Sequence, residues 1–131
     1  MPYRIYTASK MRDGDYWESM REHVRPAGIV FHARWLEHHK KATPDTPENA
    51  KHFWVEDIED VLVSHAVFVM GHPGTHLRGA LVEVGAALAH AIPVLTIGKF
   101  PDYGTWQYHP KVVRCDDLDH AIHEFINRFR D

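Results

Sequence analysis

The chain has 131 residues, a formal net charge of −3 and a single cysteine, Cys115. This length fits one domain over residues 1–131 with a sizeable core, and the charge leaves no basic excess for binding nucleic acid. One cysteine excludes an internal disulfide framework, no signal peptide is apparent and no apolar run approaches membrane-spanning length, so we expect a cytoplasmic protein without a membrane partner.

The first 49 residues predict a strand, a helix, a second strand and a loop. Residues 3–8 are rich in β-forming side chains, and residues 13–25 carry an apolar stripe at helical spacing. A Pro-Ala-Gly break follows, and residues 29–35 have the β propensity of a second strand. Residues 37–49 are polar, contain two prolines and predict a loop.

The alternation continues to the end of the chain. Pro47 suits the first turn of a helix that Thr46 caps and that runs to about residue 63. This helix is expected to turn inward Phe53, Trp54, Ile58, Val61 and Leu62. Later segments predict strands at 66–70, 93–97 and 112–115, a helix around Glu83, an aromatic-rich loop at 98–109 and a closing helix at 116–129.

Strands that alternate with helices indicate an α/β fold. We expect one doubly wound sheet of five parallel strands in flavodoxin-like order, with helices on both faces and right-handed crossovers. The first strand is not followed by a G-x-G-x-x-G run, which argues against a dinucleotide-binding fold.

Glu83 is the most informative residue of the chain. It follows the apolar strand 66–70, near the start of a helix whose other residues are small or apolar. Ligands bind open α/β sheets at the carboxyl ends of the strands, so a carboxylate here lies in a cleft or is buried at a high cost. The alternative is an exposed glutamate that the helix dipole favours.

The loop after the first strand has the composition of an anion site. Ser9, Lys10, Arg12 and Gly14 precede a helix N-terminus, where a hydroxyl, cations and free backbone N–H groups suit a phosphate. The alternative is an ordinary polar loop, with an aspartate (Asp13 or Asp15) as the helix cap.

Four carboxylates lie close together on the helix predicted at 47–63, namely Glu56, Asp57, Glu59 and Asp60. Most are expected to be solvated, but one beside Phe53 and Trp54 could meet Glu83 at the carboxyl edge of the sheet. Paired carboxylates allow one to stay ionised while the other donates a proton.

These motifs resemble those of the nucleoside 2-deoxyribosyltransferase-like family, which includes nucleotide N-hydrolases. The resemblance covers residues 3–98: an acid-bearing helix, an apolar strand, a glycine-containing turn, the E-x-G-x-A phrase at 83–87 and a Pro-Val strand start. It implies that Glu83 is the nucleophile, that Asp57 binds and protonates the base, and that Tyr6 orients Glu83. Ser9, Lys10 and Arg12 match the phosphate-binding loop of the N-hydrolase relatives.

The chain departs from the family pattern before the nucleophile, where Thr75-His76-Leu77-Arg78 replaces the usual aspartate near the sugar hydroxyls. Gly79, Trp54 and Trp106 are further candidates for substrate contact. Trp106 lies in an aromatic loop that, by resemblance, would complete the site of a second subunit, and we expect a homo-oligomer. Alternatively, Trp106 only covers a helix of its own chain.

Twelve histidines raise the question of a metal site, but neither His72 with His76 nor His120 with His123 has metal-binding context. We expect no metal and no cofactor, and a structural role for Cys115. By the resemblance, the expected partner is a small nucleoside or nucleotide. Three functions remain open: deoxyribosyl transfer between nucleosides, hydrolysis of nucleoside 5′-monophosphates, and nucleotide sensing without catalysis.

Overall fold

The computed structural model describes residues 2–38, 44–74, 76–98 and 104–130. Five parallel strands form one sheet in the order β2-β1-β3-β4-β5. The strands are β1 (Tyr3–Ala8), β2 (Ile29–Phe31), β3 (Ala66–Met70), β4 (Val94–Ile97) and β5 (Val112–Cys115). The predicted flavodoxin-like α/β fold is confirmed.

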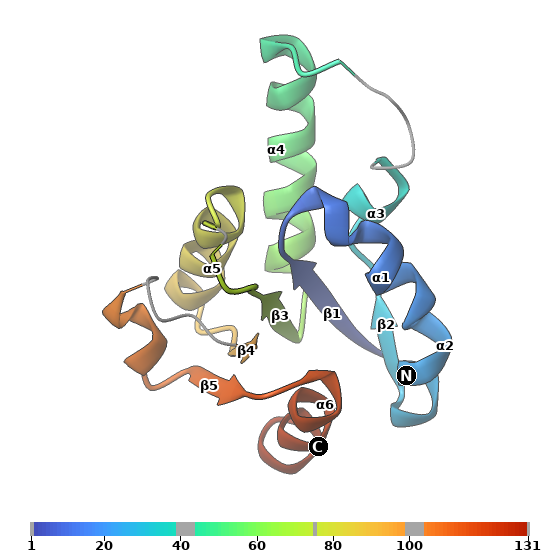
Figure 1. Cartoon of the computed structure of the whole chain (residues 1–131), viewed down its shortest axis with the longest axis vertical. Coiled ribbons are helices and arrows are strands. Elements are labelled where there is room, and N and C mark those ends of the chain that lie inside the picture. The colour runs from blue at the N-terminus through green and yellow to red at the C-terminus, as the bar shows by residue number, and fades with distance from the viewer. Residues whose placement is uncertain (1, 39–43, 75, 99–103, 131) are drawn as a thin grey trace.

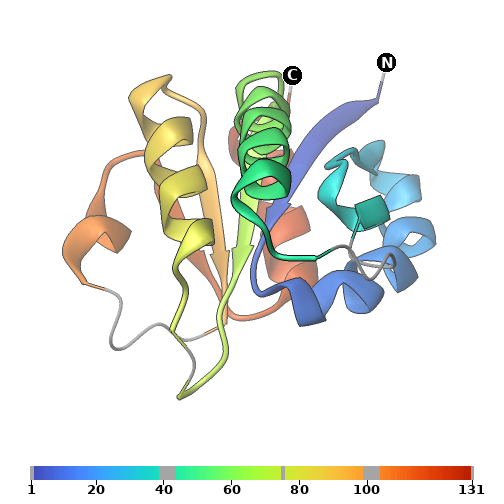
Figure 2. The ribbon, with the colours of Figure 1, turned by 90° about the horizontal axis from the view of Figure 1, so that it is seen from above.

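Helices cover both faces of the sheet (Figures 1 and 2). The α-helices are α1 (Gly14–Ser19), α2 (Arg21–Val24), α3 (Trp35–His38), α4 (Pro47–Leu62), α5 (Gly79–Ala89) and α6 (Leu118–Arg128). Three short 3-10 helices complete the described elements, at Met11–Asp13, Arg25–Ala27 and Thr105–Tyr108. α4 and α5 lie side by side on one face, and α6 lies behind the sheet (Figure 2).

The core on the α6 face is aromatic. Trp17 of α1 packs edge-on against Phe31 of β2, Phe31 against Phe68 of β3, and Phe68 against Phe125 of α6. All four side chains are almost fully buried, so this row of rings joins α1 and α6 to β2 and β3. The helices α4 and α5 and the side chain of Tyr6 lie on the opposite face of the sheet.

Two predicted elements of the N-terminal half are wrong in extent. The second strand ends at Phe31 instead of residue 35, because Trp35 begins α3 and its indole N–H donates to the carbonyl of Thr7 at 2.7 Å. The helix predicted at 13–25 divides at Met20, whose ψ of −3° interrupts the helical backbone.

The loop predicted at 37–49 is shorter, since Glu37 and His38 belong to α3 and α4 begins at Pro47. Thr46 caps α4 as predicted, because its Oγ1 accepts a hydrogen bond from the backbone N–H of Asn49. Residues 39–43 and 99–103, which fall in the two predicted loops, lie outside the described residues. The prediction that Trp54 and Leu62 point inward is wrong, since these residues are 38% and 41% exposed. They are exposed because the sheet covers only one side of α4 and α5 lies beside it.

Candidate active site

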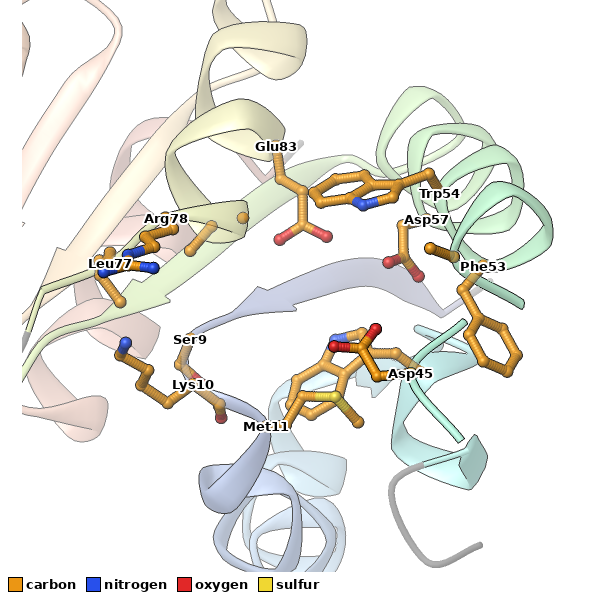
Figure 3. Close-up of a pocket in the computed structure, with 14 residues that line it drawn as sticks. Ser9, Lys10, Met11, Asp45, Phe53, Trp54, Asp57, Leu77, Arg78 and Glu83 are labelled. Carbon is orange, nitrogen blue, oxygen red and sulfur yellow. The ribbon is translucent and has the colours of Figure 1, made fainter. Parts of the chain in front are cut away.

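A cavity of about 330 Å³ opens at the carboxyl end of β1, between the segment after that strand, α4 and the start of α5. Figure 3 shows Glu83 between two unlike ends of this cavity. Ser9, Lys10 and Arg78 lie at one end, and Phe53, Trp54 and Asp57 lie at the other. Volumes of this size are within the range of small-molecule sites, and the edge of the sheet is where α/β folds bind ligands.

Glu83 lines the cavity although its side chain is buried, so the alternative of an exposed glutamate at a helix start is wrong. The hydroxyl of Tyr6, on β1, donates a hydrogen bond to Oε2 of Glu83. Burial raises the pKa of Glu83 to about 8, the charge of Asp57 adds to this rise, and the Tyr6 hydrogen bond opposes it. Burial and the charge of Glu83 also raise the pKa of Tyr6, which keeps Tyr6 a donor.

Asp57 reaches the same cavity from α4. One of its oxygens, Oδ1, is buried without a hydrogen-bond partner among the described residues. Burial first, and then the charge of Asp60, raise the pKa of Asp57 to about 6. A carboxyl group with this pKa can give up or take a proton near neutral pH, as proton transfer in catalysis requires.

The other three acids of the group at positions 56–60 have a cation or a histidine beside them. Asp60 accepts from the backbone and side chain of Arg34, and Glu59 also lies next to Arg34. Glu56 contacts His38 at 2.8 Å. Among the described residues, Asp57 is therefore the one of these four acids without such a partner, and it lines the cavity.

Trp54 and Gly79 meet where α4 approaches α5. A Cβ atom placed on Gly79 would lie 3.2 Å from two carbons of the Trp54 indole, so the ring lies directly against this glycine. Glu83 follows Gly79 by four residues, about one helical turn, and all three residues line the cavity. Trp54 and Phe53 thus form an aromatic wall next to the Glu83 carboxyl group, suited to the flat face of a base.

The segment after β1 brings two of its three predicted anion-binding residues to the cavity. Ser9 and Lys10 line it, and Ser9 Oγ also accepts from the Trp17 indole at 2.8 Å. Arg12 is exposed and is not among the lining residues, because residues 11–13 form a 3-10 turn that carries its side chain elsewhere. Gly14 has an ordinary helical φ of −56° and supplies no special backbone geometry.

Arg78 lines the cavity, which Arg12 was predicted to do. It is the residue before α5 and lines the cavity opposite the aromatic wall (Figure 3). The sequence held a signal for Arg78, since this cation follows strand 66–70 within the Glu83 segment. Asp13 lies 3.1 Å from His72, so the segment after β1 is joined to the segment after β3 beside this cationic end. The Asp13 side chain makes no capping bond.

Six further lining residues were missed: Met11, Trp35, Asp45, Ala50, Leu77 and Ala80. Met11 and Leu77 lie in segments that were singled out for other residues, and only the folded chain brings these side chains to the cavity. Trp106 does not line it. Its side chain is half-buried and packs against the core of its own chain.

Among the described residues, no group of three or more His, Cys, Asp or Glu side chains could hold a metal ion. Cys115 is buried, and burial raises the pKa of its thiol to about 12, which suits the structural role expected of it. In the same part of the chain, no helix is long and apolar enough to cross a membrane.

No protein-family model and no curated protein sequence matches the chain. Solved structures do share its fold. A 2-deoxyribosyltransferase from Bacillus psychrosaccharolyticus is 14% identical with a TM-score of 0.68, over 91% of this chain and 90% of its own. A conserved protein from Enterococcus faecalis V583 is 18% identical with a TM-score of 0.67, over 98% and 99%.

A CMP N-glycosidase from Clostridium botulinum is 9% identical with a TM-score of 0.56, over 93% of this chain and 97% of its own. The chain therefore has the fold of the nucleoside 2-deoxyribosyltransferase-like proteins, as its sequence motifs predicted. At these identities the likeness is one of fold, so the function has to be argued from the cavity itself.

Proposed function

We propose that this protein cleaves the N-glycosidic bond of a (deoxy)nucleoside or nucleotide, passing the sugar to another base or to water. The observation that carries the proposal is the Glu83 carboxyl group. It is buried, accepts a hydrogen bond from Tyr6, and faces a cavity whose aromatic end carries a second carboxyl group, Asp57.

The reaction follows from the chemistry of the bond. As the bond between the anomeric carbon and the base breaks, its electron pair leaves with the base and the sugar becomes cationic. An oxygen of Glu83 bonds to the anomeric carbon, while Asp57 donates a proton to the departing base. Water or a second base then attacks the same carbon and displaces Glu83, and its proton returns to Asp57.

Tyr6 is the residue that would position the nucleophile. Its hydroxyl group donates to Oε2 of Glu83, which leaves Oε1 free to attack. A hydrogen bond to the ionised form also favours that form, and this partly offsets the burial that raises the pKa of Glu83.

Incubating the protein with a panel of nucleosides and 5′-monophosphates, with and without a free acceptor base, tests the proposal by chromatography. Release of base without acceptor indicates hydrolysis, and exchange only with acceptor indicates transfer. Glu83→Gln and Glu83→Ala should each abolish turnover and keep the fold. If either variant retains more than about a tenth of the wild-type rate, Glu83 is not the nucleophile. Binding without turnover in the wild type would favour the sensing function.

Hydrolysis of a nucleoside 5′-monophosphate is the second candidate, favoured by the cationic end of the cavity. Lys10 and Arg78 line it together with Ser9, and no carboxylate of the described residues pairs with either cation. An anionic group on the sugar side of the substrate would meet these two charges while the base lies against the aromatic wall.

Lys10→Ala and Arg78→Ala should therefore raise KM for a monophosphate and spare the matching nucleoside. The loss of one charge-assisted contact costs about 1.5–3 kcal/mol, or roughly 10- to 150-fold in affinity. Arg12→Ala is the matched control, since it removes a cation of the same segment that lies outside the cavity. Equal effects on nucleoside and monophosphate would argue for nucleosides as substrates.

A further inference from the structure

Asp45 is a carboxylate of the cavity that the proposed reaction does not use. It belongs to the segment just before α4, and in Figure 3 its carboxylate points into the cavity beside Met11. No hydrogen bond or ion pair joins the Asp45 side chain to any other residue that the structure describes. Both of its oxygens are thus free to accept from a bound molecule.

The backbone on each side of Asp45 is anchored to the start of α4. The carbonyl of Pro44 accepts from the Thr46 amide at 3.0 Å and from the Asn49 side chain at 2.9 Å. Thr46 Oγ1 accepts in turn from the Asn49 amide at 3.2 Å. The backbone at Asp45 is therefore tied to the first turn of α4, the helix that carries Asp57, and such support of the backbone favours a selective contact.

The arrangement of the cavity decides which part of a substrate Asp45 would meet. Glu83 lies between the cationic end and the aromatic wall, and Asp45 lies on the side of the wall (Figure 3). A substrate with its anomeric carbon at Glu83 and its anionic group near Lys10 extends its base along Phe53 and Trp54. In this pose the polar edge of the base would be the part that meets Asp45, across the cavity from Trp54.

We propose that Asp45 selects the base by accepting a hydrogen bond from its exocyclic amino group, an inference that rests on the proposed function. A carboxylate accepts hydrogen bonds and has no proton to donate. Cytosine and adenine present an amino group at the edge in question, whereas uracil and hypoxanthine present a carbonyl oxygen that repels a carboxylate. The substrates are therefore amino-bearing nucleosides or nucleotides, in preference to their oxo counterparts.

Equilibrium binding separates this inference from catalysis. Glu83→Gln is titrated by calorimetry with matched pairs of ligands: deoxycytidine against deoxyuridine, and deoxyadenosine against deoxyinosine, each as nucleoside and as 5′-monophosphate. We expect the amino member of at least one pair to bind about tenfold more tightly. Adding Asp45→Asn should reduce the preference to less than about threefold, because an amide accepts from an amino group and also donates to a carbonyl.

Glu48→Gln, added to Glu83→Gln in place of Asp45→Asn, is the matched control. It removes a carboxylate three residues away, in the first turn of α4, that does not line the cavity, and the preference should survive. The inference is overturned if Glu83→Gln binds both members of every pair equally, or binds none of them, or if the preference persists in Asp45→Asn. A preference for amino bases without turnover by the wild type would overturn the proposed function and leave the role of Asp45 standing.

Discussion

At the scale of single residues, the site depends on a carboxyl group that the fold buries. Glu83 lies among the small and apolar residues of α5, and its carboxyl group lines the cavity. Tyr6 is the one hydrogen-bond donor to this carboxyl group among the described residues. Burial dominates and raises the pKa of Glu83 to about 8, and a smaller rise takes the pKa of Asp57 to about 6. Each raised pKa has a consequence that can be measured.

The first consequence is a loss of stability as pH rises. The ordinary pKa of a glutamate is 4.5, and that of folded Glu83 is about 8. Between these values the unfolded chain releases a proton that the folded chain keeps, so unfolding becomes more favourable with rising pH, and the loss is complete above about pH 8. Glu83→Gln cannot ionise and should gain stability relative to the wild type between pH 5 and pH 9, by up to a few kcal/mol.

Thermal or denaturant unfolding of both proteins at the two pH values measures this difference. Glu48→Gln, which removes an exposed acid, should have the stability of the wild type at both pH values. A difference between Glu83→Gln and the wild type that is the same at pH 5 and pH 9 would mean that Glu83 does not ionise in this range.

The second consequence concerns the pH dependence of kcat/KM. The proposed reaction requires an ionised Glu83 and a protonated Asp57, yet Glu83 has the higher pKa. The required state is therefore a minor one that is most populated between the two values, so kcat/KM should follow a bell with limbs near pH 6 and pH 8.

In Asp57→Asn only Glu83 still titrates. The profile should lose its descending limb, and the much lower activity should rise to a plateau above about pH 8. Asp57→Asn should also slow substrates with poor leaving groups more than those with good ones. If kcat/KM of this variant still falls above pH 8, or if both kinds of substrate lose equally, another group donates the proton.

At the scale of elements, the site depends on how closely α4 and α5 approach. Gly79, the first residue of α5, lies against the Trp54 ring, so the position of the aromatic wall is set by the absence of a side chain. Gly85 lies in the same helix with nothing within 4 Å of the place of a Cβ atom. The two glycines provide a matched pair of substitutions.

Gly85→Ala should stabilise the protein by about 0.5–1 kcal/mol, because alanine is the better helix former, and it should leave kcat/KM unchanged. Gly79→Ala should lose this gain and reduce kcat/KM several-fold, because its methyl group must displace the Trp54 indole. Thermal unfolding and steady-state kinetics of both variants measure these two effects. If the two variants have the same stability and the same kcat/KM, the Trp54 ring moves aside without affecting the site.

At the scale of the whole molecule, we expect a homo-oligomer. Tyr108 is 68% exposed in the Thr105–Tyr108 turn, where the guanidinium of Arg114 lies 4.5 Å from its ring centre. Val82 is 54% exposed on α5, a helix whose other side faces the sheet. Surfaces of this kind favour contact between copies, and pairs with two-fold symmetry are the commonest oligomers.

Light scattering at micromolar concentration tests the expectation. Tyr108→Ala should weaken association and activity together if the turn reaches the cavity of a second copy, and Val82→Glu should weaken association if the outer face of α5 is the contact. Trp106→Ala is a poorer probe, because Trp106 also packs against its own core. A wild-type monomer with full activity would exclude a shared site.

The sequence by itself determined the sheet, the elements that carry the site and the identity of its central acids. Residues 66–70 are a continuous apolar run, as in a parallel strand buried on both faces, and residues 3–8 and 112–115 are rich in β-forming side chains. All three strands were predicted at their observed bounds. Glu83 and Asp57 stood out because each is an acid next to apolar residues, and the motif resemblance linked Glu83 to Tyr6. The local sequence pattern was sufficient where the periodicity of a single strand or helix determines its secondary structure and its buried side.

Only the tertiary structure decided which loop residues meet. Arg12 and Arg78 are both cations near a strand end, and the 3-10 turn at residues 11–13 removes the first from the cavity while the start of α5 brings the second to it. Asp45 belongs to the cavity because capping bonds at the start of α4 hold its segment there. These positions arise from contacts between segments far apart in the chain, for which a local sequence pattern carries no signal.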